Sequence, residues 1–179
     1  MKSLTHHANF TNSPAYVAME VHEEAFSHAA ITQMEAANAI EQVFQYYQLT
    51  FKHRPKLKAF VHTSTRIPVG LKAAPLIGAS DRTLGLQIPE ARTTSGGATR
   101  GMLKRVGLLT TTGGEYFRGC IVFGHRNADK QIIAATGIRY GVRIRAHEKV
   151  MLTWRLPSPD EYKINAIARA KENFNEQAL

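Results

Sequence analysis

The sequence contains a single cysteine, Cys120, in 179 residues. One thiol excludes an internal disulfide framework and a zinc site built on cysteines. No apolar run approaches the roughly 18 residues that cross a bilayer as a helix. The first 13 residues lack the apolar core of a secretory signal. We therefore expect a soluble protein, made in a reducing compartment or for a virion.

Familiar catalytic and cofactor patterns are also missing. None of the 8 histidines forms a His-x-x-x-His pair, so no metal site is expected. The glycine-rich segment 96–104 lacks the Lys-Ser or Lys-Thr of a phosphate-binding loop. Cys120 is expected to act as a small buried hydrophobe in a strand. With no acid–base pair in view, we expect no enzyme, no catalytic residue, no cofactor and no small-molecule substrate.

Positive charge, in contrast, is abundant and unevenly placed. The chain has 23 Lys and Arg against 14 Asp and Glu, a net charge of +9. Residues 51–156 carry 19 bases and five acids, whereas the two flanking segments are net acidic. A basic stretch of this kind attracts phosphates, either of nucleic acid or of anionic lipid headgroups.

Hydrophobic periodicity predicts an α+β fold. We expect a single domain over residues 14–179 after a mobile N-terminal arm, residues 1–13. An antiparallel sheet would carry a helix over Ser27–Leu49 and a C-terminal helix that begins with Ser158 as N-cap. Further segments are predicted as strands over 15–22, 57–61, 84–88 and 115–123, and as loops over 66–83 and 90–105. Residues 131–135 form another short apolar run.

The segment from Ile138 to Leu156 reads as a β-hairpin. A three-residue loop at 146–148 would pair Ile138 with Leu156 and Tyr140 with Trp154, which keeps the apolar side chains on one face. The other face would then carry five bases that bind phosphate: Arg139, Arg143, Arg145, Lys149 and Arg155. A second basic cluster is predicted at Arg100, Lys104 and Arg105. Alternatively, these long side chains extend into water and discourage edge pairing.

The order of elements supports a family resemblance. A strand (Tyr16–His22), a helix (Ser27–Leu49), a Lys-x-Arg-Pro turn ending at Pro55 and a strand (Lys58–Ser64) follow one another. A late basic hairpin then leads into a helix opened by Ser158–Glu161. This order resembles the matrix proteins of rhabdoviruses, particularly the short ones of plant-infecting members. The chain lacks a Pro-Pro-x-Tyr motif and the Lys-rich N-terminal arm of some members.

The resemblance implies a non-enzymatic viral structural protein. Helices would cover one side of a central antiparallel sheet. The protein would form homo-oligomers, bind viral ribonucleoprotein and RNA, and contact the anionic inner membrane surface, in the virion and the host cytoplasm. Self-association would use a mobile loop over 92–105, with Met102 and Leu103 as its exposed apolar pair.

Two alternatives stay open at this point. The first is a bacteriophage capsid, neck or tail-connector subunit, since a mobile arm and a glycine-rich loop suit a chain ordered by its neighbours. The second is a cellular basic nucleic-acid-binding module that lays its hairpin along phosphates. No helix-turn-helix, zinc finger or ribonucleoprotein motif indicates sequence-specific binding.

Overall fold

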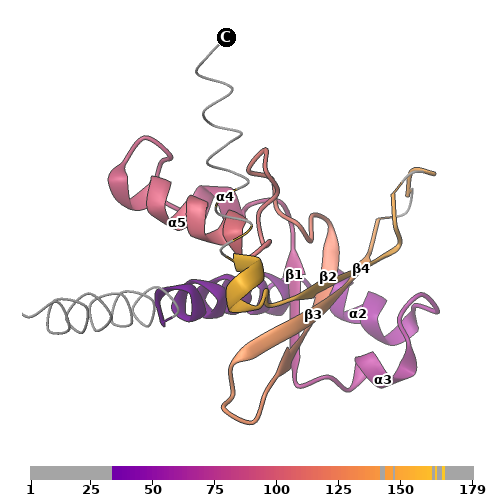
Figure 1. Ribbon diagram of the computed structural model, residues 1–179. Coiled ribbons are helices and arrows are strands. Elements are labelled where there is room, and N and C mark those ends of the chain that lie inside the picture. Colours follow the sequence, from indigo (N-terminus) through magenta and orange to yellow (C-terminus); the bar gives the residue numbers. More distant parts are fainter. Residues whose placement is uncertain (1–33, 142–143, 147, 163, 165–166, 168–179) are drawn as a thin grey trace, which may run out of the picture. The chain divides into compact units, whose positions relative to one another are not determined.

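The computed structural model describes residues 34–141, 144–146, 148–162, 164 and 167. The chain divides into two compact units, Met1–Glu35 and Ala36–Leu179, and the second holds one four-stranded antiparallel sheet in the order β1-β2-β3-β4 (Figure 1). The strands are β1 Leu76–Ser80, β2 Cys120–Arg126, β3 Ile132–Arg139 and β4 Met151–Arg155. The helices are α2 Pro55–Thr63, α3 Val69–Lys72, α4 Leu84–Gln87 and α5 Thr94–Arg105. The predicted α+β class is confirmed.

A helix over residues 34–52, which we call the long helix, precedes α2. The predicted helix over 27–49 is therefore confirmed from residue 34, and it continues three residues further than expected. The predicted arm over 1–13, the strand over 15–22 and the Ser27 cap lie outside the described residues. Among the residues that are described, no helix is long and apolar enough to cross a membrane.

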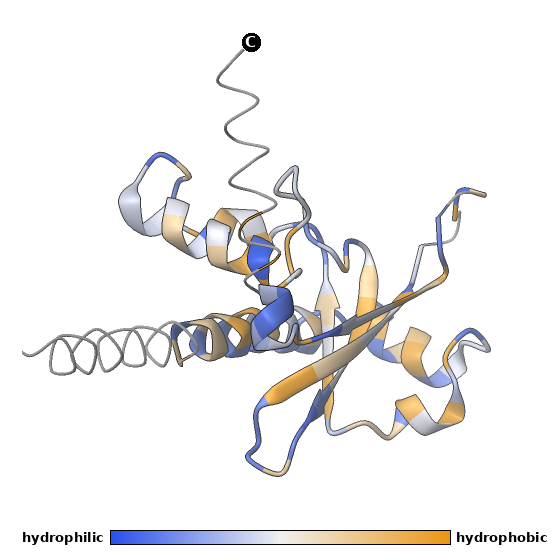
Figure 2. Cartoon of the chain, in the orientation of Figure 1, coloured by the Kyte–Doolittle hydropathy of each residue, from blue (hydrophilic) through white to orange (hydrophobic). Residues whose placement is uncertain are grey.

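The sheet is covered on both faces. Val122 of β2 packs in one core cluster with the helix over 34–52, whereas its neighbours Ile121 and Phe123 pack in another with Val61 of α2. Figure 2 shows the hydrophobic residues that run along the central strands. The expectation of helices on one side only was wrong, because a strand buried on both faces reads as a continuous apolar run.

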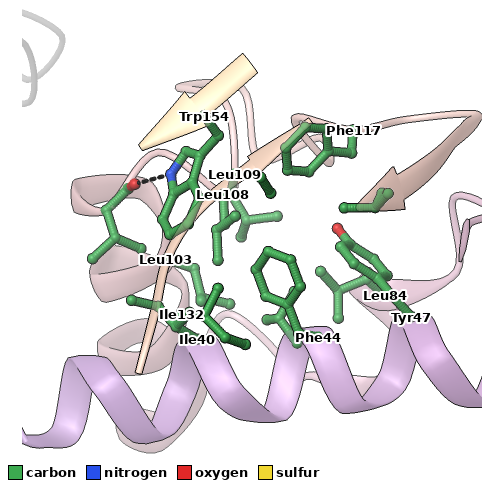
Figure 3. Close-up of a cluster of buried hydrophobic side chains, with 14 of the residues drawn as sticks. Ile40, Phe44, Tyr47, Leu84, Leu103, Leu108, Leu109, Phe117, Ile132 and Trp154 are labelled. Carbon is green, nitrogen blue, oxygen red and sulfur yellow. Dashed lines mark hydrogen bonds between the residues drawn. The ribbon is translucent and has the colours of Figure 1, made fainter. Parts of the chain in front are cut away.

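Aromatic side chains join the long helix to the sheet in the larger core cluster (Figure 3). The rings of Phe44 and Tyr47 meet edge to face, with centroids 5.9 Å apart, and the Phe44 ring lies 6.0 Å from that of Trp154. The Trp154 indole N–H donates to the carbonyl oxygen of Val106 at 2.7 Å. This bond fixes β4 against the segment that follows α5.

Trp154→Phe is expected to lower the free energy of unfolding by about 2 kcal/mol. The substitution leaves the buried Val106 carbonyl without its donor, and an unsatisfied buried group costs about 1–3 kcal/mol. Urea unfolding followed by circular dichroism measures the loss. Tyr116→Phe is the control, because the Tyr116 hydroxyl donates to the Thr153 carbonyl at 2.8 Å in an exposed position. If Tyr116→Phe lowered the free energy of unfolding as much as Trp154→Phe, burial of the hydrogen bond would not explain the loss.

Two segments predicted as strands are helices. Residues 57–61 belong to α2, where Pro55 occupies the first turn, and Leu57, Phe60 and Val61 face the smaller core cluster at helical spacing. Residues 84–87 form the single turn of α4, with Leu84 buried and Leu86 exposed. In both places a short alternation of apolar residues also fits a helix, and tertiary packing selects the helix.

The segment predicted as a flexible loop over 90–105 is mostly the helix α5. The Thr93 side chain caps it by accepting from the backbone N–H of Gly96 at 3.1 Å. Leu103 is buried in the larger core cluster, and Met102 packs against it. The expected exposure of Met102 and Leu103 is therefore wrong, since these two side chains anchor α5 on the core.

The C-terminal helix begins where the sequence predicts. The Ser158 hydroxyl accepts from the Glu161 backbone N–H at 3.3 Å, and the Glu161 carboxylate accepts from the Ser158 N–H at 2.8 Å. This reciprocal pair is a capping box. Residues 159–162, 164 and 167 are helical, and Tyr162 packs against the larger core cluster.

The predicted hairpin register was wrong. Ile138 pairs with Met151 instead of Leu156, and Trp154 pairs with Ala135 instead of Tyr140. The strand begins earlier than expected, at Ile132, so the apolar run over 131–135 and the start of the predicted hairpin form one strand. The connection to β4 is correspondingly longer than three residues and covers 140–150.

Candidate functional site

Basic residues gather at the end of the sheet where β1 and β3 finish and β2 and β4 begin. The register aligns this end, because Ser80 pairs with Cys120, Cys120 with Arg139, and Ile138 with Met151. Residues that flank these positions in all four strands therefore lie at the same end of the sheet. We call the following set the basic rim: Arg54, Arg66, Arg82, Arg118, Arg139 and Lys149.

Arg139, at the end of β3, binds two connections of the rim. Its Nε donates to the Lys149 carbonyl at 3.0 Å and its Nη1 to the Arg118 carbonyl at 2.9 Å. Arg66, which follows α2, donates to the Gly141 carbonyl at 2.8 Å. These bonds use backbone acceptors, so the positive charges come together without being neutralised by them.

The Arg82 guanidinium lies close to Gly119, the residue that follows Arg118. Gly119 has a φ of 73° and its N–H donates to the Ser80 carbonyl at 3.0 Å. A Cβ at Gly119 would lie 3.8 Å from Nη2 of Arg82. A side chain at position 119 would therefore be strained by the left-handed backbone, although its Cβ would make only an ordinary van der Waals contact with the Arg82 guanidinium.

The turn that carries Arg82 is conformationally costly. Arg82 has a φ of 75°, in the left-handed region where a non-glycine residue costs about 1–2 kcal/mol. Asp81 holds the turn, because its Oδ1 accepts from the Thr83 N–H at 3.3 Å while its Oδ2 binds Arg54 at 2.5 Å. The exposed guanidinium of Arg82 thus projects from a fixed backbone.

The rim keeps an excess of positive charge. Its six bases meet two acids, Asp81 beside Arg54 and Glu148, whose carboxylate lies 3.8 Å from Arg139. Among the described residues, no carboxylate forms a salt bridge with Arg82 or Arg118, and both side chains are exposed. Such a surface favours a ligand with several negative charges.

Buried polar groups lie beneath the rim. The Glu115 carboxylate, in a residue only 8% exposed, accepts from the Leu84 N–H at 2.8 Å and from the Ser80 hydroxyl. Burial raises the pKa of the Tyr47 phenol above its usual range, and the nearby Glu115 adds to this. Burial also raises the pKa of the Cys120 thiol to about 12. Cys120 is therefore a buried neutral thiol, as the sequence predicts.

The five bases of the predicted hairpin face do not form one wall. Arg139 and Lys149 belong to the rim, and Arg145 is exposed in the connection between β3 and β4. Arg143 lies outside the described residues. Arg155 pairs in register with Ala134, toward the opposite end of the sheet, and forms an ion pair with Glu161 at 2.5 Å. The Arg155 guanidinium and a bond from Ser158 hold the pKa of the Glu161 carboxyl at about 2.

The second predicted cluster lies on α5 and is occupied by contacts within the chain. Arg100 donates to the Gly85 carbonyl at 2.9 Å and to the Ile88 carbonyl at 3.2 Å. Arg105 donates to the Tyr162 hydroxyl at 2.9 Å and lies over its ring. Lys104, the third member, is half-buried. These arginines fasten α4 and the C-terminal helix to α5.

Four residues of the rim were not predicted from the sequence as candidate site residues: Arg54, Arg66, Arg82 and Arg118. They are far apart in the chain, and only the strand register brings them together. The segment 66–83 was predicted as a loop, so nothing in the sequence marked Asp81-Arg82 as the residues that directly follow a buried strand, β1. Arg118 lies at the same end of the sheet, two residues before β2 begins.

The fold is found in DNA primases. The structure of the DnaG catalytic core matches with a TM-score of 0.51 at 17% identity, over 70% of this chain and 38% of that one. The DnaG primase catalytic domain bound to ssDNA matches with a TM-score of 0.52 at 16% identity, over 74% and 42%. The zinc-binding and RNA polymerase domains of the Aquifex aeolicus primase match with a TM-score of 0.50 at 14% identity, over 71% and 30%.

The chain thus spans less than half the length of these primases. No protein-family model and no curated protein matches the sequence. In the described part of the chain, no group of three or more His, Cys, Asp or Glu could hold a metal ion.

The likeness to primases overturns the resemblance to rhabdovirus matrix proteins. The shared fold is that of part of an enzyme's catalytic core, so the expectations of a virion structural role and of no enzymatic function were wrong. None of the neighbours reported above is a phage virion subunit or a free-standing basic module. These two alternatives gain no support.

Proposed function

We propose that this chain holds single-stranded DNA as a part of a primase-like enzyme, and that the basic rim is the surface that binds it. The observation that carries the proposal is the convergence of six bases, from segments far apart in the chain, on one end of the sheet. The fold adds support, because one protein that shares it is a primase catalytic domain bound to ssDNA.

The chemistry of the rim suits a nucleic-acid backbone. Guanidinium groups bind phosphate oxygens through charge-assisted hydrogen bonds, often two at a time. Arg82 and Arg118 are exposed, and their neighbours Arg139 and Arg66 are held in place by backbone carbonyls. Contacts of this kind position a strand regardless of its base sequence, as a template-holding surface must.

Of the partners predicted from the sequence, this proposal keeps nucleic acid alone. A membrane surface, a ribonucleoprotein and a second copy of the chain are not part of it.

The test is binding to a short, fluorescently labelled DNA strand, measured by fluorescence anisotropy across a series of salt concentrations. Three to four phosphate contacts predict a slope of log K against log salt of about −2 to −3, since each contact on a single strand contributes about −0.7. The same oligonucleotide annealed to its complement gives the comparison with duplex. An affinity that does not change with salt concentration, or that is higher for the duplex than for the single strand, would contradict the proposal.

A further inference from the structure

Glu115 links two exposed arginines of the rim, Arg82 and Arg118. Its side chain binds both ends of the turn that carries Arg82, through the Ser80 hydroxyl and the Leu84 N–H. Its backbone carbonyl accepts from the Arg118 N–H at 3.3 Å. One residue therefore contacts the turn of Arg82 through its carboxylate and the position of Arg118 through its main chain.

This arrangement costs more free energy than a contact with only a structural role would need. A carboxylate loses its hydration when it is buried, and Glu115 is only 8% exposed. The turn above it holds Arg82 at a φ of 75°, which side chains rarely adopt. A buried charge and a strained residue thus occur together, directly beneath an exposed guanidinium that no described carboxylate neutralises.

We infer that Glu115 is a positioning residue, which holds the turn of Ser80–Leu84 so that Arg82 is already in place to bind a phosphate group. The inference rests on the proposed function. Glu115 would not touch the ligand itself. Its contribution would be to lower the entropic cost of ordering the Arg82 side chain when DNA binds.

A double-mutant cycle tests this inference. The variants are Glu115→Gln, Arg82→Ala and the two combined, and the readout is the Kd for the labelled DNA strand at a temperature where each variant is folded. Loss of the Arg82 contact is expected to weaken binding about tenfold. Glu115→Gln is expected to weaken it about fivefold, and the double variant no further than Arg82→Ala alone.

Matched controls separate positioning from stability. Ile132→Val removes a buried methyl group at the far end of the sheet and destabilises the fold without touching the rim. Its affinity for the strand is expected to equal that of the wild type. If Glu115→Gln does not fold, Ser80→Ala takes its place, because it removes one of the two side-chain bonds that hold the turn.

The outcomes are distinct. Additive losses in the cycle, or an equal loss of affinity in Ile132→Val, would overturn the positioning role while leaving the proposed function intact. A wild-type protein that does not bind the strand would refute the proposed function and this inference with it.

Discussion

Charge reversal at Arg82 and Arg118 together is expected to weaken binding of single-stranded DNA about 100-fold at low salt. Each arginine offers a charge-assisted bond to phosphate, which contributes about 1.5–3 kcal/mol. Two such losses amount to about 3 kcal/mol, and each 1.4 kcal/mol is a factor of ten in affinity. The Arg82→Glu, Arg118→Glu variant also places two carboxylates where the strand would lie.

The fold should survive this change. Both side chains are exposed, and neither forms a salt bridge with a described residue. The carbonyl of residue 118, which accepts from Arg139, belongs to the backbone and stays in place. Circular dichroism and urea unfolding are therefore expected to match the wild type, and fluorescence anisotropy across a salt series gives the affinity and a shallower salt slope.

The matched control reverses two bases outside the rim, Arg92→Glu with Lys130→Glu. Both are exposed, and Lys130 lies in the turn between β2 and β3, at the opposite end of the sheet. The control has the same net charge as the rim variant, so it removes general attraction equally. If the control weakened binding as much as the rim variant does, affinity would depend on net charge alone and the rim would not be the binding surface.

Local signals in the sequence predicted local structure well. The apolar spacing of Ile40, Phe44 and Tyr47 predicts the long helix, and all three are buried. Ser158 as N-cap predicts the start of the C-terminal helix, and the structure shows its hydroxyl accepting from the Glu161 N–H. These features depend on residues within about one turn of each other, which is the range over which sequence patterns are informative.

Strand and helix were confused where packing decides between them. Leu57 and Val61 satisfy a strand pattern, yet Phe60 completes a helical face that packs against the smaller core cluster. The resemblance to matrix proteins depended on a strand at this place. Once this segment is the helix α2, the order of elements differs, and the resemblance loses its basis.

The candidate site could not be predicted because it is assembled by register. The alternation of apolar and polar residues around Ile138 and Trp154 was recognised as a strand pattern. The pairing of β3 with β4, however, depends on where β3 begins, and β3 begins at Ile132, earlier than expected. A shift in register reassigns every cross-strand neighbour. Arg139 was therefore identified with the wrong partners, and Arg82, far away in sequence, was missed.

The long helix lies very close to β1 at Gly78, so a side chain at this position is expected to have a large effect on the stability of the fold. A Cβ at Gly78 would lie 2.6 Å from the Cβ of Tyr47 and 2.9 Å from its carbonyl carbon. These atoms belong to the backbone and the root of a side chain, so a rotamer change cannot relieve the overlap. The helix would have to shift away from β1, and with it the Phe44–Tyr47 pair of the larger core cluster.

Gly78→Ala is therefore expected to lower the free energy of unfolding by about 3 kcal/mol, at the upper end of the usual cost of overpacking a core. Strand propensity alone predicts the opposite sign, because glycine weakens a strand interior. Gly70→Ala in α3 is the control, since a Cβ added at Gly70 would meet no heavy atom within 4 Å, and a helical glycine replaced by alanine gains up to about 1 kcal/mol. Urea unfolding of both variants measures the difference. A Gly78→Ala protein as stable as the wild type would mean that the helix does not lie this close to β1, and the larger core cluster would then need another arrangement.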